Sequence, residues 1–512
     1  MPFDPLFELP LRAFAAGGRD PQFVPVQLFL RQFGYLDPAA DLDGHLGPVT
    51  QSALRVFQRA EGLEPTGRLD EATAQAIELP RCGEMDHPPG DHDEIVMAQS
   101  TVWVQPGDIK ARRHYRRSFT WAFDRSVAAP NKPFTPDLPT STVRDIVREA
   151  FAEWAAQTDL VFVEVDDSPA DFEVYFGPER PKPSWHTLAT AELGGRELHF
   201  RDGWRWEEMV HTDTKYGQHL LSIAIHEIGH LLGLAHGPRH SIMSSRASAR
   251  RRLHRADVER VRALYPRRQL VPIGGHVLDH LGHGNGYRVW RFDPTGADPL
   301  PGPAVQSGHW SGVDDTHTLI PMGNTHVLDW VPLERTFRLW SFDPTRKDPL
   351  PKKVQSGRWR TVDAGHVLVP VGTFVIDYVP RTGAFRVYPF DPSQSDPLPG
   401  PALSSGTWSD VWGKDVLVPM GSQHVLVWNP PTGDYRLYRF DPRASDPLVG
   451  SPIAQGRWST IKSGHHLVPL GTHILDWVPH TGGYRLWKID LTAADPLVRM
   501  GVVGTWSTVR GH

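Results

Sequence analysis

The chain has 512 residues and a mass of 57.4 kDa, and at about 100–200 residues per domain this length predicts three or four domains. Hydrophobic residues make up 39% and charged residues 22% of the chain, which excludes disorder throughout. The net charge of −5 excludes a strongly basic nucleic-acid-binding surface, and no apolar run reaches the roughly 18 residues that a membrane-spanning helix needs.

The first ten residues do not form a recognisable signal peptide. They have no basic start, and acidic residues and prolines interrupt their apolar stretch. The single cysteine, Cys82, excludes an internal disulfide, so a secreted chain would have to fold without one.

Residues 22–79 have the pattern of a small helical domain. One helix face is predicted from the spacing of Val26, Leu28, Phe29, Phe33 and Leu36. After a turn, Thr50 is expected to cap a second helix, and Asp70 is expected to cap a third.

Residues 115–267 alternate strand and helix signals. Strands are predicted at Phe119–Phe123, Leu160–Val165, Phe172–Phe176 and Glu197–Phe200. A helix is expected to start at Ser141, with an apolar face made of Val143, Ile146, Val147, Ala150, Phe151 and Trp154. Two more helices are predicted at 217–232 and Arg255–Tyr265. This mixture predicts an α+β domain.

The strongest chemical signal is the motif His226-Glu227-x-x-His230-x-x-Gly233-x-x-His236. His226 and His230 are four residues apart, so a helix places both imidazoles on one face. Gly233 can adopt a left-handed backbone that returns His236 as a third ligand. Three imidazoles leave a zinc ion one open position for water, with Glu227 as the base. The alternative is a buried helix whose histidines are satisfied by hydrogen bonds.

Together with Pro80-Arg-Cys82-Gly-Glu-Met-Asp86, this motif resembles the matrix metalloproteinases of the metzincin clan. The resemblance covers about residues 22–267 and includes Met243, which matches the family's Met-turn. It implies that 22–79 is a peptidoglycan-binding-like prodomain and that Cys82 is a cysteine switch, binding zinc in the latent form only. Arg81 and Asp86 are expected to pair and hold that loop.

The same resemblance implies an endopeptidase that binds its substrate antiparallel to an edge strand near Leu198. It also implies an apolar specificity pocket beside His226, walled by the segment after Met243. The family's structural zinc and its neighbouring calcium are doubtful here, because Thr190 and Arg201 replace expected ligands and only His199 matches clearly. His186 is interpreted as a surface histidine. The basic run at 112–117 is either a processing site or a solvated strand edge.

The remainder of the chain is a repeat of about 49 residues, visible in Val-Pro pairs and in a tryptophan two residues after a glycine. In the third unit, strands are predicted at His366–Pro370, Phe374–Tyr378, Phe385–Phe390 and Thr407–Val411. Five units of four strands predict a five-bladed β-propeller. The final Gly511-His512 pair matches the start of other units, which predicts that the ring closes.

The propeller resembles the tachylectin style, in which each blade can present a sugar site. His276, His326, His424 and His473 recur beside Asp279, Asp329 and Asp476, with Phe374 and Val427 breaking the pattern. These polar pairs are interpreted either as multiplied ligand sites or as hydrogen bonds that lock each blade.

The expected architecture is therefore a small all-α prodomain (22–79), a switch segment and linker (80–114), an α+β metzincin catalytic domain (115–267) and an all-β propeller (269–512). The predicted function is an extracellular zinc metalloendopeptidase with one catalytic zinc, acting on protein or peptide substrates. A glycan or cell-surface ligand is expected for the propeller, and cell-wall contact through the prodomain is a further expectation. The alternative is a multivalent adhesin with a vestigial protease domain.

Overall fold

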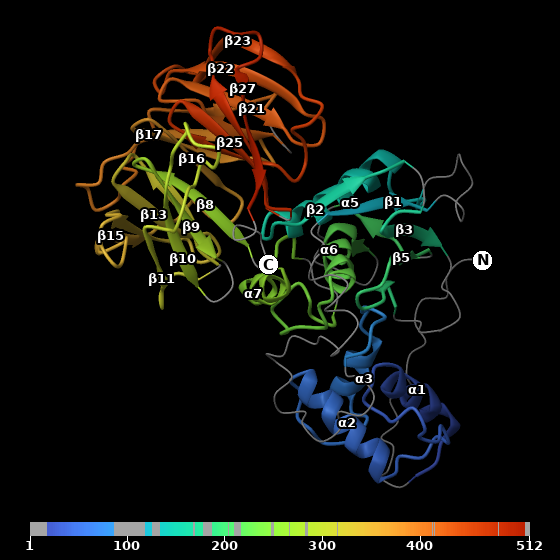
Figure 1. Cartoon of the computed structure of the whole chain (residues 1–512). Coiled ribbons are helices and arrows are strands. Elements are labelled where there is room, and N and C mark those ends of the chain that lie inside the picture. Colours follow the sequence, from blue (N-terminus) through green and yellow to red (C-terminus); the bar gives the residue numbers. More distant parts are fainter. Residues whose placement is uncertain are drawn as a thin grey trace. The chain divides into compact units, whose positions relative to one another are not determined.

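The computed structural model describes residues 18–86, 118–124, 134–166, 169–177, 187–202, 204–208, 217–246, 250–265, 267–281, 285–314, 316–411, 413, 415–479 and 481–506. The chain divides into two units, of which the first holds the helical region and the histidine motif and the second holds the repeats (Figure 1). The first ten residues, the basic run at 112–117, His186 and the Gly511-His512 pair lie outside the described residues. In the described ranges, no helix has the length and apolar character needed to cross a membrane.

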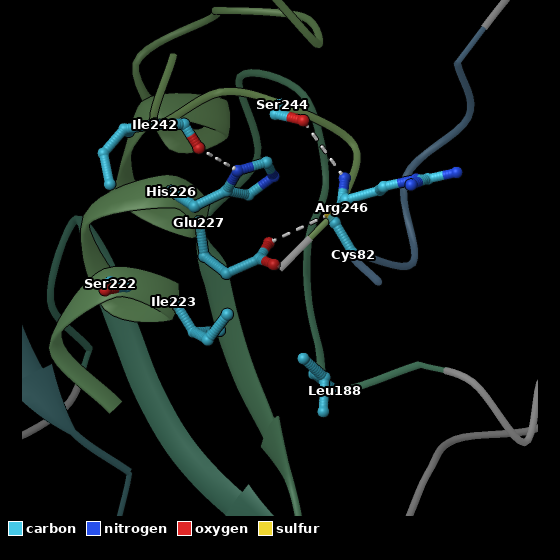
Figure 2. A pocket seen from close by; sticks show the side chains of 9 residues that line it. All are labelled: Cys82, Leu188, Ser222, Ile223, His226, Glu227, Ile242, Ser244 and Arg246. Carbon is cyan, nitrogen blue, oxygen red and sulfur yellow. Dashed lines mark hydrogen bonds between the residues drawn. The ribbon is translucent and has the colours of Figure 1, made fainter. Parts of the chain in front are cut away.

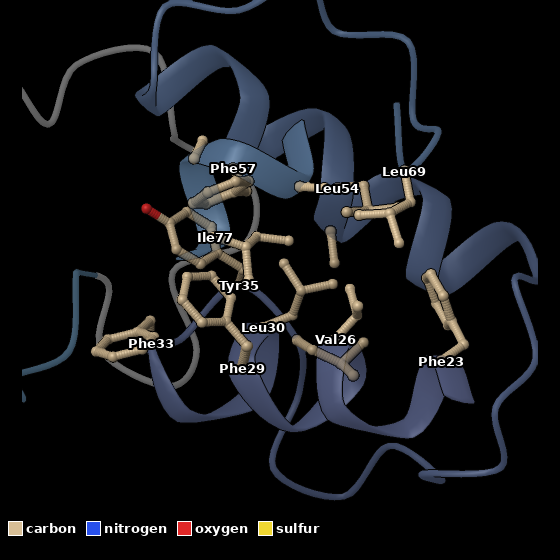
Figure 3. Packing of buried hydrophobic residues seen from close by; sticks show 14 of the residues in the cluster. Phe23, Val26, Phe29, Leu30, Phe33, Tyr35, Leu54, Phe57, Leu69 and Ile77 are labelled. Carbon is tan, nitrogen blue, oxygen red and sulfur yellow. The ribbon is translucent and has the colours of Figure 1, made fainter. Parts of the chain in front are cut away.

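The helical region folds as predicted into a small all-α domain. It consists of a 3₁₀ turn and three helices: η1 (Pro21–Phe23), α1 (Val24–Gln32), α2 (Pro48–Ala60) and α3 (Glu71–Glu78). Their apolar faces meet in one core, where the ring of Phe57 lies edge-on to Phe29 and to Tyr35, each at a centroid distance of 5.3 Å (Figure 3). Such aromatic pairs add to the energy of burial and fix the angle between the helices.

Two local predictions in this region are wrong. Leu28 lies outside the core with 40% of its surface exposed. Thr50 does not cap α2, because the helix begins at Pro48 after Gly47, and proline suits the first helical position. Asp70 does cap α3, since its carboxylate accepts a hydrogen bond of 2.9 Å from the backbone N–H of Thr73.

The mixed region contains a five-stranded sheet in the order β2-β1-β3-β5-β4. Its strands are β1 (Ser118–Phe123), β2 (Val161–Glu164), β3 (Phe172–Gly177), β4 (Ala189–Ala191) and β5 (Glu197–Arg201). β3 and β5 are parallel, whereas β4 runs antiparallel to β5. An edge strand was expected near Leu198. The edge strand is β4, which was not predicted from the sequence, and its Ala191 pairs with Leu198 of the interior strand β5. Two short strands, β6 (Trp206–Glu207) and β7 (Gln218–His219), form a separate parallel pair.

Three helices accompany this sheet: α5 (Thr140–Ala155), α6 (Leu220–Leu231) and α7 (Arg255–Leu264). All six residues of the predicted α5 face are buried. The indole N–H of Trp154 donates a 2.8 Å hydrogen bond to the backbone carbonyl of Ile225, which ties α5 to α6. Every residue of α6 is buried, so this helix is a fixed support for the side chains that it presents.

The second unit contains five four-stranded antiparallel sheets, which confirms the five-bladed propeller. The blades are β8 (Arg268–Ile273), β9 (His276–Leu281), β10 (Gly286–Arg291) and β11 (Gln306–His309); β12 (Thr318–Met322), β13 (His326–Val331), β14 (Thr336–Ser341) and β15 (Lys352–Arg358); β16 (Val367–Val371), β17 (Phe374–Val379), β18 (Ala384–Pro389) and β19 (Ser404–Thr407); β20 (Val416–Pro419), β21 (His424–Asn429), β22 (Asp434–Phe440) and β23 (Leu448–Arg457); and β24 (His466–Leu470), β25 (His473–Val478), β26 (Gly483–Ile489) and β27 (Leu497–Thr505). In the third blade the fourth strand ends at Thr407, where the sequence predicted a start, because Trp408 leaves the strand to stack on Phe385 at 4.2 Å.

The repeated tryptophans join each blade to the next. Each indole N–H donates to an aspartate of the following blade, as in Trp310 to Asp348 (3.1 Å) and Trp408 to Asp446 (2.9 Å). Trp506 of the last blade donates to Asp298 of the first at 2.9 Å. The ring is therefore closed by the same contact that joins its neighbouring blades.

Candidate metal centre

The two histidines of α6 present the same nitrogen to the same point. Their Nε2 atoms lie 3.0 Å apart. The Nδ1 of His226 lies 2.7 Å from the backbone carbonyl of Ile242, and that of His230 lies 2.7 Å from the carbonyl of Leu234. A carbonyl can only accept, so both Nδ1 atoms carry the proton and both Nε2 atoms have a free lone pair.

The chain reverses after α6 and brings back the third histidine. Gly233 has a φ of +94°, a conformation that glycine adopts without steric cost. The Nδ1 of His236 lies 2.8 Å from Asp86 Oδ1. Its buried Nε2 has no hydrogen-bond partner within the described part of the chain.

Four donor atoms converge at this point. The ligand atoms of Cys82, His226, His230 and His236 all lie within 4.8 Å of one another. Burial is the main reason that the pKa of His226 falls to about 3 and that the pKa of His230 is lowered. Three imidazoles and one sulfur, with an unsatisfied buried nitrogen among them, are a donor set that fits Zn²⁺.

Cys82 and Glu227 lie side by side in this centre. The sulfur of Cys82 is 3.4 Å from His230 Nε2 and 3.6 Å from Glu227 Oε2. The backbone N–H of Glu84 donates to the sulfur at 3.3 Å. Burial raises the pKa of both the Cys82 thiol and the Glu227 carboxyl. The residue expected to act as base therefore lies within reach of the position that the sulfur occupies.

The segment around Cys82 is held like an added strand. Arg81 forms backbone bridges to Thr187 on one side and to Arg246 on the other. The N–H of Leu188 donates to the carbonyl of Arg81 at 3.1 Å, and the N–H of Gly83 donates to that of Ala189 at 3.0 Å. The segment thus follows the edge that continues into β4, with Cys82 over the three histidines.

Buried charges hold this segment in place. Arg81 and Asp86 form an ion pair in which the two side chains are 2% and 6% exposed, as the sequence predicted. The guanidinium of Arg81 also lies 4.0 Å from the centroid of the Phe33 ring. Although burial alone would raise the pKa of Asp86, Arg81 and His236 together lower it well below its usual range. Asp86 therefore joins the segment around Cys82 to a candidate metal ligand.

Met243 supports the centre from beneath without contributing to it. It is fully buried, and a Cβ on Gly229 would meet its sulfur at 2.3 Å, so the turn packs directly against α6. Sequence analysis gave no role to Asp257, whose carboxylate accepts from the N–H groups of Ile242 (2.9 Å) and Met243 (3.2 Å). Through Ile242, Asp257 also positions the carbonyl that orients His226. Its position shortly after the Met-turn was the only available signal.

A small cavity adjoins the centre (Figure 2). Its volume is about 10 Å³, close to the space of one water molecule. It is lined by Cys82, Leu188, Ser222, Ile223, His226, Glu227, Ile242, Ser244 and Arg246. The cavity lies beside His226, where a specificity pocket was expected, and that role stays a prediction.

His199, the one clear match to the family's structural zinc site, has other contacts. Its ring stacks on Tyr175 at 4.4 Å, and its Nε2 lies 3.0 Å from the carbonyl of Gly177. Thr190 is its cross-strand neighbour. The expectation of no structural zinc and no adjacent calcium stays a prediction.

The polar residues of the blades are paired differently from the sequence interpretation. The buried aspartates bond to a histidine before the first strand and to an arginine on the third, as in His366–Asp377–Arg386 at 2.5 and 2.7 Å. The same cluster occurs around Asp329 and Asp476. His276 and Asp279 do not pair, because residues three apart on a strand point to opposite faces. The aspartates therefore lock the blades, which was one of the two alternatives.

The fourth blade also has a carboxylate at this cluster, but a different residue supplies it. Val427 stands where the other blades have aspartate, and Asp415 stands where three of them have histidine. Asp415 lies 3.3 Å from Arg436. The carboxylate of this blade lies just before its first strand, and its arginine partner is retained.

Comparisons with known proteins found two family models that match the part of the chain before the repeats. The Matrixin family model matches residues 113–266, and the peptidoglycan binding domain model matches residues 19–77. Matrix metalloproteinase-2 of Drosophila melanogaster is 31% identical over 41% of this chain and 28% of its own length. Metalloendoproteinase 1-MMP of Arabidopsis thaliana is 31% identical over 42% of this chain and 59% of its own length.

Human matrix metalloproteinase-19 is 32% identical over 48% of this chain and 46% of its own length. The chain thus spans between 28% and 59% of these relatives. The likeness to matrixins thus lies in residues 113–266, and the likeness to peptidoglycan binding domains lies in the helical region before them, at residues 19–77.

Proposed function

We propose that the chain is a zinc-dependent metalloendopeptidase that Cys82 keeps latent. One observation carries this proposal: four ligand atoms from Cys82, His226, His230 and His236 lie within 4.8 Å of one another, with Glu227 beside the sulfur. In this proposal residues 22–79 are the prodomain, 80–114 the switch segment and linker, 115–267 the catalytic domain and 269–512 the propeller.

The chemistry follows from the positions of these side chains. A bound zinc ion would supply a Lewis acid that polarises a peptide carbonyl and acidifies a water molecule. Glu227 takes the proton from the attacking water and passes it to the leaving amine. Cys82 occupies the position that water and the peptide need, so the chain is inactive until this segment is displaced.

The test compares the full chain with its Cys82→Ala and Glu227→Ala variants for zinc content and casein cleavage. We expect one zinc per chain, low activity in the unmodified protein, higher activity without Cys82 and none without Glu227. Zinc binding without cleavage in Cys82→Ala would contradict the switch. Cleavage that persists in Cys82→Ala/Glu227→Ala would contradict the role of Glu227.

For the propeller we propose a binding role that targets the protease outside the cell. A cavity of about 1080 Å³ is lined by the first strands of all five blades, including the proline that recurs in each of them after valine or, in the second blade, after isoleucine. A glycan array and a cell-wall pull-down with the full chain would test this role and separate propeller ligands from cell-wall contact by the helical domain. Ligand binding by a chain that lacks protease activity in every variant would favour the adhesin alternative.

A further inference from the structure

An ion pair connects the helical domain to Arg246, which lines the small cavity beside the metal centre. Glu61, at the C-terminal end of α2, pairs with Arg246 in the segment after Met243. The carboxylate side chain is 3% exposed and the guanidinium side chain is 25% exposed. This contact does not involve Cys82, so the latent chain has a second attachment at the cleft.

A second arginine faces the same carboxylate. A Cβ on Gly62 would lie 2.2 Å from an Nη1 atom of Arg239, so this guanidinium packs directly against the turn after Glu61. Burial raises the pKa of Glu61, and the charges of Arg246 and Arg239 both oppose that rise. The Glu61 carboxylate therefore pairs with Arg246, and the charges of Arg81 and Arg239 also favour its ionised form.

Arg246 also belongs to the cleft itself. It lines the small cavity together with Cys82, His226 and Glu227. Its backbone bridges to Arg81, the residue immediately before Cys82, at a place where an extended peptide lies across the centre. Figure 2 shows its side chain extending from the cavity wall away from the histidine. The guanidinium is thus within reach of a peptide residue near the reacting bond.

Release of the helical domain removes the carboxylate and leaves the two arginines behind. Burial lowers the pKa of Arg246, and repulsion from Arg239 adds to this, whereas the charge of Glu61 opposes it. Both guanidinium groups then lack this carboxylate, and a guanidinium binds a carboxylate with two parallel hydrogen bonds. In the latent chain, Glu61 is the carboxylate that pairs with Arg246.

We propose that Arg246, with Arg239 beside it, selects substrates with an acidic side chain within three residues of the scissile bond, and that Glu61 occupies this position in the latent chain. This inference rests on the proposed peptidase function. It assigns a substrate preference to two residues that do not hold the metal and do not transfer protons. It also makes the helical domain an internal mimic of the preferred substrate.

The test uses the full chain with Cys82→Ala and Glu61→Gln, so that neither contact holds the helical domain in the cleft. Fluorogenic peptides that differ only by Glu, Gln or Arg at one position are compared by kcat/KM. We expect Glu to be preferred over Gln about fivefold at one position. Added Arg246→Gln should abolish this preference, and Arg246→Glu should reverse it towards Arg peptides. Arg443→Gln, at an exposed position of the propeller, is the matched control and should retain it.

Cleavage of the Gln peptides shows that each variant is folded and active. A Glu preference that survives Arg246→Gln, or equal kcat/KM for Glu and Gln at every position, would overturn the inference. A binding measurement with Glu227→Ala added separates it from the peptidase proposal, because binding needs no cleavage. If no variant cleaves, Arg246-dependent binding of the Glu peptide still supports the preference, whereas equal binding of Glu and Gln peptides overturns it.

Discussion

The sulfur of Cys82 lies 3.4 Å from Nε2 of His230, although 148 residues separate them in the chain. The same sulfur lies 3.6 Å from the carboxylate of Glu227. This one contact links the segment after the helical domain to both elements of the proposed chemistry: a ligand and the base. Its consequences can be measured without knowledge of the physiological substrate.

Metal removal is expected to destabilise the latent chain more than the Cys82→Ala chain. Binding to the folded state alone stabilises a protein in proportion to the logarithm of its affinity, and the sulfur adds a fourth protein ligand. The measurement is the shift in Tm of the first unit on adding a chelator. A shift of equal size in both proteins would show that the sulfur does not bind the metal.

Asp257→Asn is expected to lower stability and metal affinity together. The carboxylate accepts from three backbone N–H groups, of Ile242, Met243 and His254, and the amide can satisfy fewer of them. We expect a loss of about 1–3 kcal/mol in the free energy of unfolding and about tenfold in zinc affinity. Denaturant unfolding and competition with a chromophoric chelator measure the two effects.

The matched control for this change is Asp202→Asn on the loop after β5. A normal zinc affinity in Asp257→Asn, despite lost stability, would show that the Met-turn does not position His226.

Stability is expected to fall as the pH drops from about 6.5 to about 4. His219 caps α6: its Nδ1 accepts from the N–H of Ser222 at 3.3 Å, and its Nε2 lies 3.1 Å from the carbonyl of Glu208. Burial, followed by the charge of Arg251, lowers the pKa of His219 to about 4. As the pH falls, His219 therefore binds a proton in the unfolded chain before it does so in the folded chain. The free energy of unfolding falls by on the order of 3 kcal/mol across this range.

His219→Asn tests this account, because asparagine also caps helices but does not titrate. The free energy of unfolding at several pH values should become flatter in this variant. His309→Asn, at an exposed propeller position, should leave the slope unchanged. The same slope in His219→Asn and in the unmodified protein would rule out His219 as its source.

Asp298→Ala is expected to weaken the closure of the propeller. The carboxylate accepts from the indole of Trp506 and from the N–H of Leu300, both at 2.9 Å. Leaving these donors without a partner should cost about 1–3 kcal/mol. Asp446→Ala breaks the equivalent contact with Trp408 and should cost a similar amount. Calorimetry measures the Tm of the propeller in both variants. A lower Tm in Asp446→Ala but not in Asp298→Ala would contradict the role of Asp298 in closing the ring.

Local sequence patterns were sufficient to predict those parts of the structure that depend on residues close together in the chain. The apolar face of α5 was predicted residue by residue, because a helix brings positions three and four apart together. The spacing of His226 and His230 follows from the same geometry. The repeat period was sufficient for the blades, since each repeat unit is one sheet.

Errors arose where a residue's partner lies on another strand or in another domain. The edge strand β4 is three residues long and has no pattern of its own; it exists because β5 pairs with it. The blade aspartates bond to residues on neighbouring strands, which sequence proximity assigned to the wrong histidines.

The sequence by itself determined the helices, the repeat and the set of side chains that could bind a metal, because these depend on short-range periodicity and on residue chemistry. The tertiary structure alone decided that Glu61 meets Arg246, that Asp86 meets His236 and that Asp257 supports the turn beneath α6. Each of these is a buried charge whose partner lies far along the chain. Such a charge is stable only where folding supplies the opposite charge or the hydrogen bonds it needs.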